Sequence, residues 1–99
     1  MKVIYSDLKN KRVFISGGGS GIGATIVEYF CEQESEVYFI DIDIKSSNKL
    51  IKNIKRKGFK IPKFIECNIL DVKKLQNIIK DIISKKGAIH CLINSAAND

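Results

Sequence analysis

Five glycines fall within the seven positions 17–23, between an apolar run and a helix-like pattern. Three of them, Gly17, Gly21 and Gly23, give the spacing G-x-x-x-G-x-G. The first turn of a helix carries unpaired N–H groups and the positive end of the helix dipole, so it binds anions that can approach the backbone closely. Glycine permits the sharp turn and leaves room for a pyrophosphate, and Ser20 adds a hydroxyl group beside it. The stretch therefore predicts a phosphate-binding loop.

An acidic residue, Asp41, lies near the end of the next apolar run, 18 residues beyond Gly23. In dinucleotide-binding folds, a carboxylate at this place accepts hydrogen bonds from the adenosine ribose hydroxyls. It would repel the 2′-phosphate of NADP, and neither Ser20 nor Ile42 supplies a cation to offset that repulsion. We therefore expect NAD to be preferred over NADP. Asp43 could be confused with Asp41 in this assignment, and a polar strand end without any ligand is the simplest alternative.

The elements that would position these residues alternate along the chain. Short apolar runs typical of buried strands occupy residues 12–16, 36–42, part of 60–69 and part of 88–96, and stretches with helical spacing separate them. Such strands are typical of a parallel sheet with helices on both faces. Right-handed crossovers then give an α/β, Rossmann-like open sheet with the expected strand order 3-2-1-4. We expect one partial dinucleotide-binding domain over residues 1–99.

Capping residues help to locate the helix ends. The helix after the second strand is lysine-rich, with Ser46 and Ser47 as candidate N-caps and Gly58 as its stop. The next helix is predicted over residues 71–86, with Asp71 as its N-cap.

Composition narrows the function classes. The net charge of +6 comes from 15 Lys and only 2 Arg, and the lysines are spread along the chain. Lysine without arginine is poor at bidentate recognition of bases or phosphates, which favours a solvated face over a nucleic-acid surface. Cys31, Cys67 and Cys91 form no C-x-x-C pair, so we expect reduced thiols in the cytoplasm rather than disulfides or a zinc site. No apolar run approaches the roughly 20 residues that cross a bilayer, and no signal peptide or membrane association is expected.

With this glycine loop, acidic residue and order of elements, the chain resembles the N-terminal part of the short-chain dehydrogenase/reductase family. That family's T-G-x-x-x-G-I-G motif corresponds to SGGGSGIG at residues 16–23, with Ser16 in place of threonine. The resemblance implies that this loop binds the cofactor through Gly17, Ser20, Gly21, Ile22 and Gly23.

Two further motifs carry the resemblance toward the C-terminus. CNILD at residues 67–71 is similar to an acidic motif of the family, with Asn68 in place of its first aspartate, and implies that Asn68 and Ile69 contact the adenine. NSAA at residues 94–97 corresponds to N-N-A-G. It implies that Asn94 braces the sheet beside the cofactor and that Ala96 lies along the nicotinamide ribose.

The catalytic residues of the family, a Ser, a Tyr-x-x-x-Lys pair and a further Asn, lie downstream of the fourth strand. The resemblance therefore assigns no catalytic residue to this chain. Tyr5 and Lys9 fit the spacing Y-x-x-x-K, but they precede the first strand and are expected at the wrong end of the sheet. His90, the only histidine, has no metal partner at ligand spacing and is expected to be structural.

The resemblance implies the NAD-binding half of an oxidoreductase that transfers hydride between NAD(H) and an alcohol or carbonyl compound. Family members are longer, so we expect a truncated product, a fragment or the first part of a split gene, without dehydrogenase activity of its own. A small-molecule substrate would bind only after completion by a C-terminal half. The fourth strand would be an exposed edge that favours self-association. A non-catalytic nucleotide-binding or interaction module and a remnant without function are the alternatives.

Overall fold

The structure, a computed structural model, describes residues 4–95. Strands and helices alternate in the order β1 (Arg12–Ser16), α1 (Gly21–Glu32), β2 (Glu36–Asp41), α2 (Ile44–Arg56), β3 (Lys63–Glu66), α3 (Val72–Lys86) and β4 (Cys91–Asn94). The strands are parallel and lie in the order β3-β2-β1-β4. The predicted fold class and strand order are therefore confirmed.

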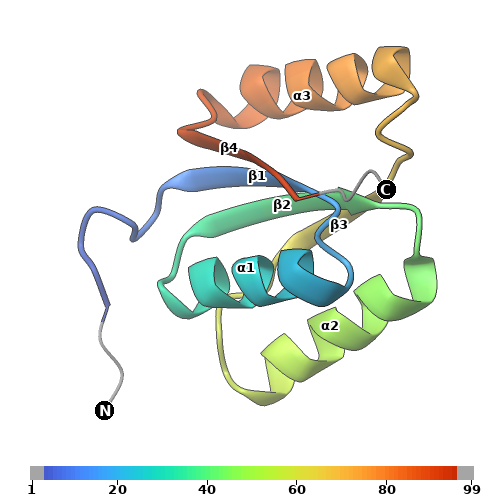
Figure 1. Ribbon diagram of the computed structural model, residues 1–99. Helices are drawn as coiled ribbons and strands as arrows, with labels where there is room; N and C mark the ends of the chain where they lie inside the picture. The colour runs from blue at the N-terminus through green and yellow to red at the C-terminus, as the bar shows by residue number, and fades with distance from the viewer. Residues whose placement is uncertain (1–3, 96–99) are drawn as a thin grey trace.

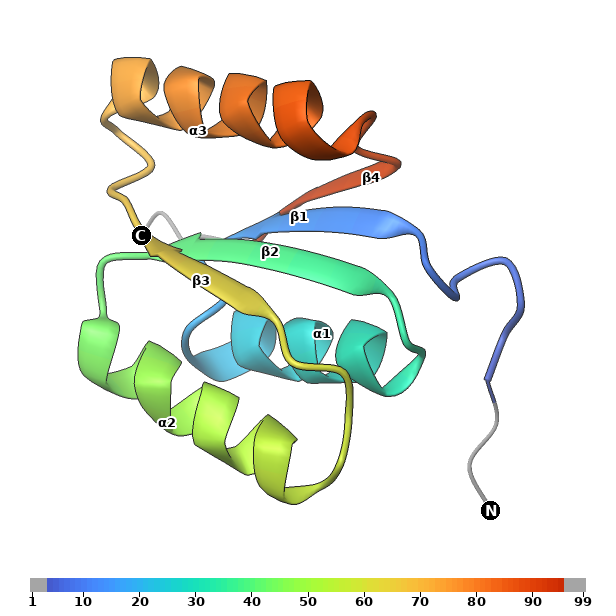
Figure 2. The ribbon, with the colours of Figure 1, turned by 180° about the vertical axis from the view of Figure 1, so that it is seen from behind.

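The sheet lies between two layers of helices. Helices α1 and α2 cover one face and α3 covers the other, as the opposite views in Figure 1 and Figure 2 show. Neighbouring residues of β1 therefore enter different cores: Val13 and Ile15 pack with α1 and α2, whereas Phe14 packs with α3. All three are at most 1% exposed. Burial on both faces explains why β1 and β2 read as continuous apolar runs, whereas the edge strands β3 and β4 are only partly buried.

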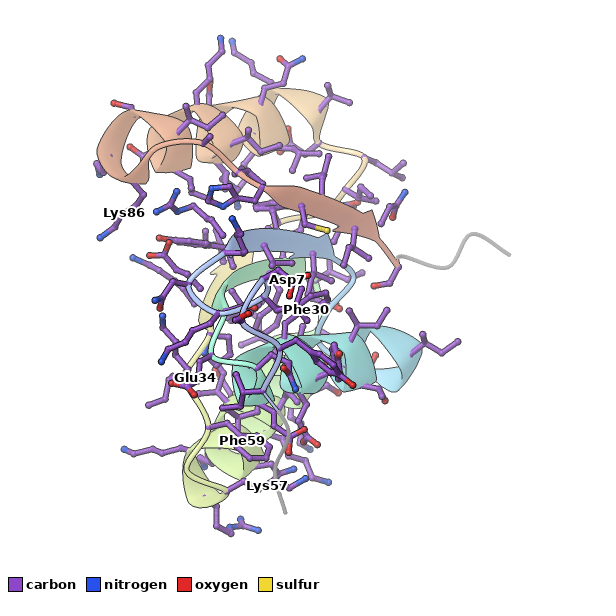
Figure 3. All side chains as sticks on the ribbon, turned by 90° about the vertical axis from the view of Figure 1, so that its left-hand side faces the viewer. Asp7, Phe30, Glu34, Lys57, Phe59 and Lys86 are labelled. Atoms are coloured by element: carbon purple, nitrogen blue, oxygen red, sulfur yellow. The ribbon has the colours of Figure 1, made fainter. Side chains whose placement is uncertain are left out.

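The larger core lies between the sheet and the α1–α2 layer. Phe39 of β2 is completely buried there and stacks on Phe64 of β3, with ring centroids 5.2 Å apart. Figure 3 shows the layers edge-on, with Phe30 and Phe59 on the same side of the sheet as α1 and α2. This core fixes the sheet against the helix whose first turn carries the glycine motif.

Helix starts agree with the sequence for α3 but not for α2. The carboxylate of Asp71 accepts a hydrogen bond from the N–H of Lys74 at 3.1 Å, so the predicted cap of α3 is confirmed. The predicted caps of α2, Ser46 and Ser47, are wrong, because Asp43 caps the helix by accepting from the N–H of Ser46 at 2.9 Å. An aspartate at the strand exit begins the helix three residues earlier than the serines would, and this buries Ser47 inside its first turns.

The parallel arrangement brings all carboxyl ends of the strands to one edge of the sheet, on the right in Figure 1. The glycine loop, the start of α2 and the start of α3 lie at this edge, while the N-terminal segment lies at the opposite one. Among residues 4–95, no helix has the length and apolar character needed to cross a bilayer.

Candidate functional site

A cleft of about 540 Å³ opens at the carboxyl edge of the sheet. It is bordered by the loops that follow β1, β2 and β3, and its lining comprises Gly17, Ser20, Gly21, Ile22, Gly23, Ile40, Asp41, Ile42, Cys67, Asn68, Ile69, Leu70 and Ser95. The structure thus gathers the predicted glycine-loop residues, Asp41, Asn68 and Ile69 around one cavity. Asn94 is not part of this lining, and Ala96 lies outside the described residues.

The glycine loop needs its glycines for conformation and for close contact. Gly17 and Gly21 have φ angles of +73° and +57°, which side chains of L-residues rarely allow. At Gly23, a Cβ atom would lie 1.8 Å from the carbonyl oxygen of Gly17, far inside van der Waals contact. The first turn of α1 can therefore pack directly on the loop only because position 23 has no side chain.

The N-terminus of α1 is left open toward the cleft. Ser20 occupies the N-cap position in an extended conformation, and its hydroxyl group makes no capping hydrogen bond. No acidic residue lies in the first turn of the helix. The positive end of the helix dipole is thus not neutralised within α1, which is the arrangement that favours an anionic ligand.

Asp41 is held at the end of β2 by two backbone donors. Its Oδ2 accepts from the N–H of Gly19 at 2.9 Å, and its Oδ1 accepts from the N–H of Asp43 at 2.8 Å. In this structure, these two bonds hold the half-buried carboxylate beside the glycine loop. Each oxygen has a further lone pair for another donor.

Asp43, which could have been confused with Asp41, has a different role. Its exposed carboxylate accepts from the backbone N–H of Ser46 and, at 2.7 Å, from the Ser46 hydroxyl group. These hydrogen bonds lower the pKa of Asp43, because they stabilise its charged form. Asp43 caps α2 and does not line the cleft, so Asp41 is the carboxylate available to a ligand there.

The segment after β3, residues 67–70, forms another wall of the cleft. The amide oxygen of Asn68 accepts from the N–H of Leu70 at 2.9 Å, which ties the side chain into a local turn. Leu70 is 79% exposed and extends the apolar surface of the rim. Beneath them, Cys67 is buried, and this burial raises the pKa of its thiol. Cys67 is therefore a neutral wall residue rather than a reactive thiolate.

The end of β4 braces the glycine loop. The hydroxyl group of Ser16 donates to the amide oxygen of Asn94 at 2.8 Å, linking β1 to β4. Ser95 donates its hydroxyl hydrogen to the carbonyl oxygen of Ser16 at 2.7 Å and also lies 3.2 Å from that of Gly17. Asn94 thus links β4 to β1 next to the glycine loop, and its bracing role beside a cofactor stays a prediction.

Several residues of the site were missed by sequence reasoning. The cleft also includes Ile40, Ile42, Cys67, Leu70 and Ser95. Gly18 and Gly19 are required as well: a Cβ atom would lie 2.8 Å from Phe39 Cβ at Gly18 and 2.3 Å from Ser47 Oγ at Gly19. The run of three consecutive glycines was the available signal, but the motif spacing drew attention to its first member only.

The remaining candidates lie away from the cleft. Tyr5 belongs to the N-terminal segment, and its N–H donates to Gln33 at the far end of α1 from the glycine loop. His90 Nδ1 accepts from the N–H of Arg12 at 2.7 Å, where β4 joins β1. Within residues 4–95, no group of three or more His, Cys, Asp and Glu could hold a metal ion. Burial raises the pKa of the Cys31 thiol to about 12, so it acts as an apolar core residue.

Comparisons with known proteins agree with this geometry. The family model of the short chain dehydrogenases matches residues 11–98. D-Xylose 1-dehydrogenase from Caulobacter vibrioides is 37% identical over 97 residues, which cover 97% of this chain and 37% of that protein. A β-ketoacyl-[ACP] reductase from Bacteroides thetaiotaomicron superposes with a TM-score of 0.79 and 32% identity, over 88% of this chain and 42% of the other.

A crystal structure described as that of a D-mannonate oxidoreductase from Haemophilus influenza, with bound NAD, shares the fold. Its TM-score is 0.78 at 23% identity, over 93% of this chain and 32% of that chain. The present chain spans about a third of the length of the curated relatives that it matches. With a family model that matches almost its whole length, the chain belongs to the short-chain dehydrogenase family.

Proposed function

We propose that this chain is the NAD-binding part of an oxidoreductase and that its cleft holds the adenosine and pyrophosphate groups of NAD. The observation that carries the proposal is the position of Asp41, whose carboxylate borders the cleft beside the open N-terminus of α1. A dinucleotide requires an anion site and a ribose acceptor at the carboxyl edge of a parallel sheet, and the cleft has both. The relative with bound NAD supports a nicotinamide dinucleotide as the ligand class.

The residues of the cleft fit such a ligand. The bare backbone of the loop at Gly23 and the N-terminus of α1 would hold the pyrophosphate. Asp41 would accept from the ribose hydroxyls, and Asn68 and Ile69 would contact the adenine. Asn94 and Ala96 would support the nicotinamide end.

The parent reaction would be hydride transfer between NAD(H) and an alcohol or carbonyl substrate. When bound, the nicotinamide ring supplies the hydride chemistry. The residues described here would bind and orient the dinucleotide, and none of them is assigned to substrate binding or proton transfer. Dehydrogenases and oxidoreductases among the matched relatives support this reaction class.

Replacing Asp41 by alanine is expected to reduce the preference for NAD over NADP. In the unmodified protein, repulsion between Asp41 and a 2′-phosphate should favour NAD by about 1–3 kcal/mol, or roughly 5- to 150-fold. The substitution removes the ribose acceptor and the repulsion together, so NAD should bind more weakly and NADP less unfavourably. Isothermal titration calorimetry with both dinucleotides measures the two affinities.

Asp43→Asn is the matched control for this experiment. Asparagine caps helices about as well as aspartate, so α2 should keep its start while a neighbouring charge is lost. The preference for NAD should persist in this variant. Equal affinities for NAD and NADP in the unmodified protein would show that Asp41 does not sit at the ribose.

We also propose that the protein self-associates through β4. Among the described residues this strand pairs with β1 alone, and Leu92 on it is 66% exposed. An apolar edge strand is a template for pairing with another chain. Light scattering should show assemblies that grow with concentration, and Leu92→Lys should reduce them more than Tyr29→Lys on α1. A monodisperse monomer at all concentrations would contradict the proposal.

The three cysteines support a reducing compartment such as the cytoplasm. All of them are free thiols, and Cys31 and Cys67 are buried in separate cores. Proteins of oxidising compartments usually pair their cysteines.

A further inference from the structure

Ser47 is a buried serine whose hydroxyl group has no hydrogen-bond partner. It is 0% exposed, and within the part of the chain that the structure describes its Oγ is the only buried side-chain polar atom left unsatisfied. Ser35 is equally buried, but its hydroxyl group donates to the carbonyl oxygen of Leu8 at 2.6 Å. A buried hydroxyl group without a partner is unfavourable, so its presence under a binding loop calls for a functional explanation.

The hydroxyl group lies directly beneath the glycine loop. A Cβ atom placed on Gly19 would be 2.3 Å from Ser47 Oγ and 3.0 Å from Asp41 Oδ2. Ser47 and Asp41 therefore converge on the same point of the loop, one from α2 and the other from β2. Among residues 4–95, no other side chain comes as close to this point.

Gly19 and Asp41, the two residues that meet Ser47 at this point, are bonded to each other in this structure. The N–H of Gly19 donates to Asp41 Oδ2 at 2.9 Å, so the donor and the acceptor at this point of the loop satisfy one another. A dinucleotide would bring its ribose hydroxyl groups to the same carboxylate as competing donors. If Asp41 turns toward the ribose, Gly19 loses its acceptor and the carboxylate loses a donor.

A serine hydroxyl group can replace both lost contacts, since it accepts through its oxygen and donates through its hydrogen. Alanine at this position would have nearly the same volume but could do neither. Because Ser47 is fixed in the first turns of α2, it could make these contacts with little additional ordering.

We propose that Ser47 is a positioning residue for dinucleotide binding, whose hydroxyl group takes over the hydrogen bonds of Gly19 and Asp41 when Asp41 engages the ribose. This inference rests on the proposed function. In the protein without dinucleotide, the hydroxyl group of Ser47 stays without a partner. Dinucleotide binding then supplies its hydrogen-bond partners.

The first test is Ser47→Ala, with Ser46→Ala as the matched control on the neighbouring residue. Ser47→Ala should weaken NAD binding by about 5- to 150-fold in calorimetry, the range expected for two lost hydrogen bonds. The thermal midpoint without NAD should stay the same or rise, because the substitution removes an unpaired buried group. Ser46→Ala removes an exposed hydroxyl contact with Asp43 and should leave the NAD affinity unchanged.

The second test is a double-mutant cycle with Asp41→Ala. If Ser47 acts through Asp41, Ser47→Ala should cause no further loss of NAD affinity once Asp41 has been replaced. If Ser47 had a structural role alone, Ser47→Ala would lower the thermal midpoint and the NAD affinity together. The loss of affinity would then also appear in the Asp41→Ala background.

Three results would overturn the inference. Unchanged NAD affinity in Ser47→Ala rejects the role of Ser47 and leaves the proposed function intact. Equal losses in the presence and absence of Asp41 reject the mechanism through Asp41. An unmodified protein that binds no NAD rejects the proposed function and this inference with it.

Discussion

Replacing Gly23 by alanine is expected to weaken NAD binding by roughly 100-fold, the effect of overpacking at the upper end of the usual range. The added Cβ atom would lie 1.8 Å from the carbonyl oxygen of Gly17 and 2.7 Å from the hydroxyl oxygen of Ser95. The first of these is backbone, so no rotamer change can relieve the contact. The first turn of α1 must move away from the loop, and the anion site opens. Calorimetric titration with NAD measures the loss.

Gly58→Ala provides the control for this substitution. Gly58 has a φ angle of +76°, a Cβ atom added there would meet no described atom within 4 Å, and the residue lies after α2, outside the cleft. This variant should lose about 1–2 kcal/mol of stability through backbone strain and still bind NAD normally. Unchanged NAD affinity in Gly23→Ala would show that the loop does not hold the dinucleotide.

Phe39→Ala should give the largest loss of stability. Phe39 is completely buried in the larger core, and it stacks on Phe64 of the neighbouring strand. Truncation of a buried phenylalanine lowers the free energy of unfolding by about 3–5 kcal/mol. Small domains have only about 5–15 kcal/mol in total, so the variant should be partly unfolded under mild conditions. Urea unfolding followed by circular dichroism measures the change.

The matched control is Tyr29→Ala, which truncates an aromatic side chain that is 43% exposed on α1. Its effect should be well below that of Phe39→Ala, because less apolar surface returns to water and no closed cavity forms. Comparable losses in the two variants would contradict the assignment of Phe39 to the centre of the core.

The order of elements could be predicted because each signal was local. The runs over residues 12–16 and 36–42 coincide with β1 and, to within one residue, with β2. Continuous apolar strands alternating with helices admit few topologies, so the strand order followed from general handedness rules. Asp71 could be identified as the cap of α3 because Leu70 before it and Leu75 after it are spaced for a hydrophobic staple.

The start of α2 was mispredicted because several capping residues lie close together. Asp43, Ser46 and Ser47 can each cap a helix, and propensity alone does not rank them. The end of β2 at Asp41 determines which residue caps α2, because it brings Asp43 into position to accept from the N–H of Ser46. The observed start of α2 matters for function, because it places Ser47 inside the helix and beneath the glycine loop.

The site was predictable in its motifs but not in its contacts. Spacing identified Gly17, Gly21, Gly23 and Asp41, which all line the cleft. It could not show that Gly19 donates to Asp41, because that bond joins the glycine loop to the end of β2, 22 residues later in the chain. Hydrogen bonds of this kind depend on the final packing of the sheet and helices.

The contact of Ser95 with the glycine loop has a consequence for the order of folding. Ser95 is bonded to the carbonyl oxygen of Ser16, 79 residues earlier in the chain. Such a contact forms only after a long loop has closed, so its entropy cost must be met before it contributes stability. The β1–β4 junction should therefore assemble late and open early in local fluctuations. Amide exchange should then be faster along β4 than in β1–β2, so the nucleotide site can open while the inner strands stay folded.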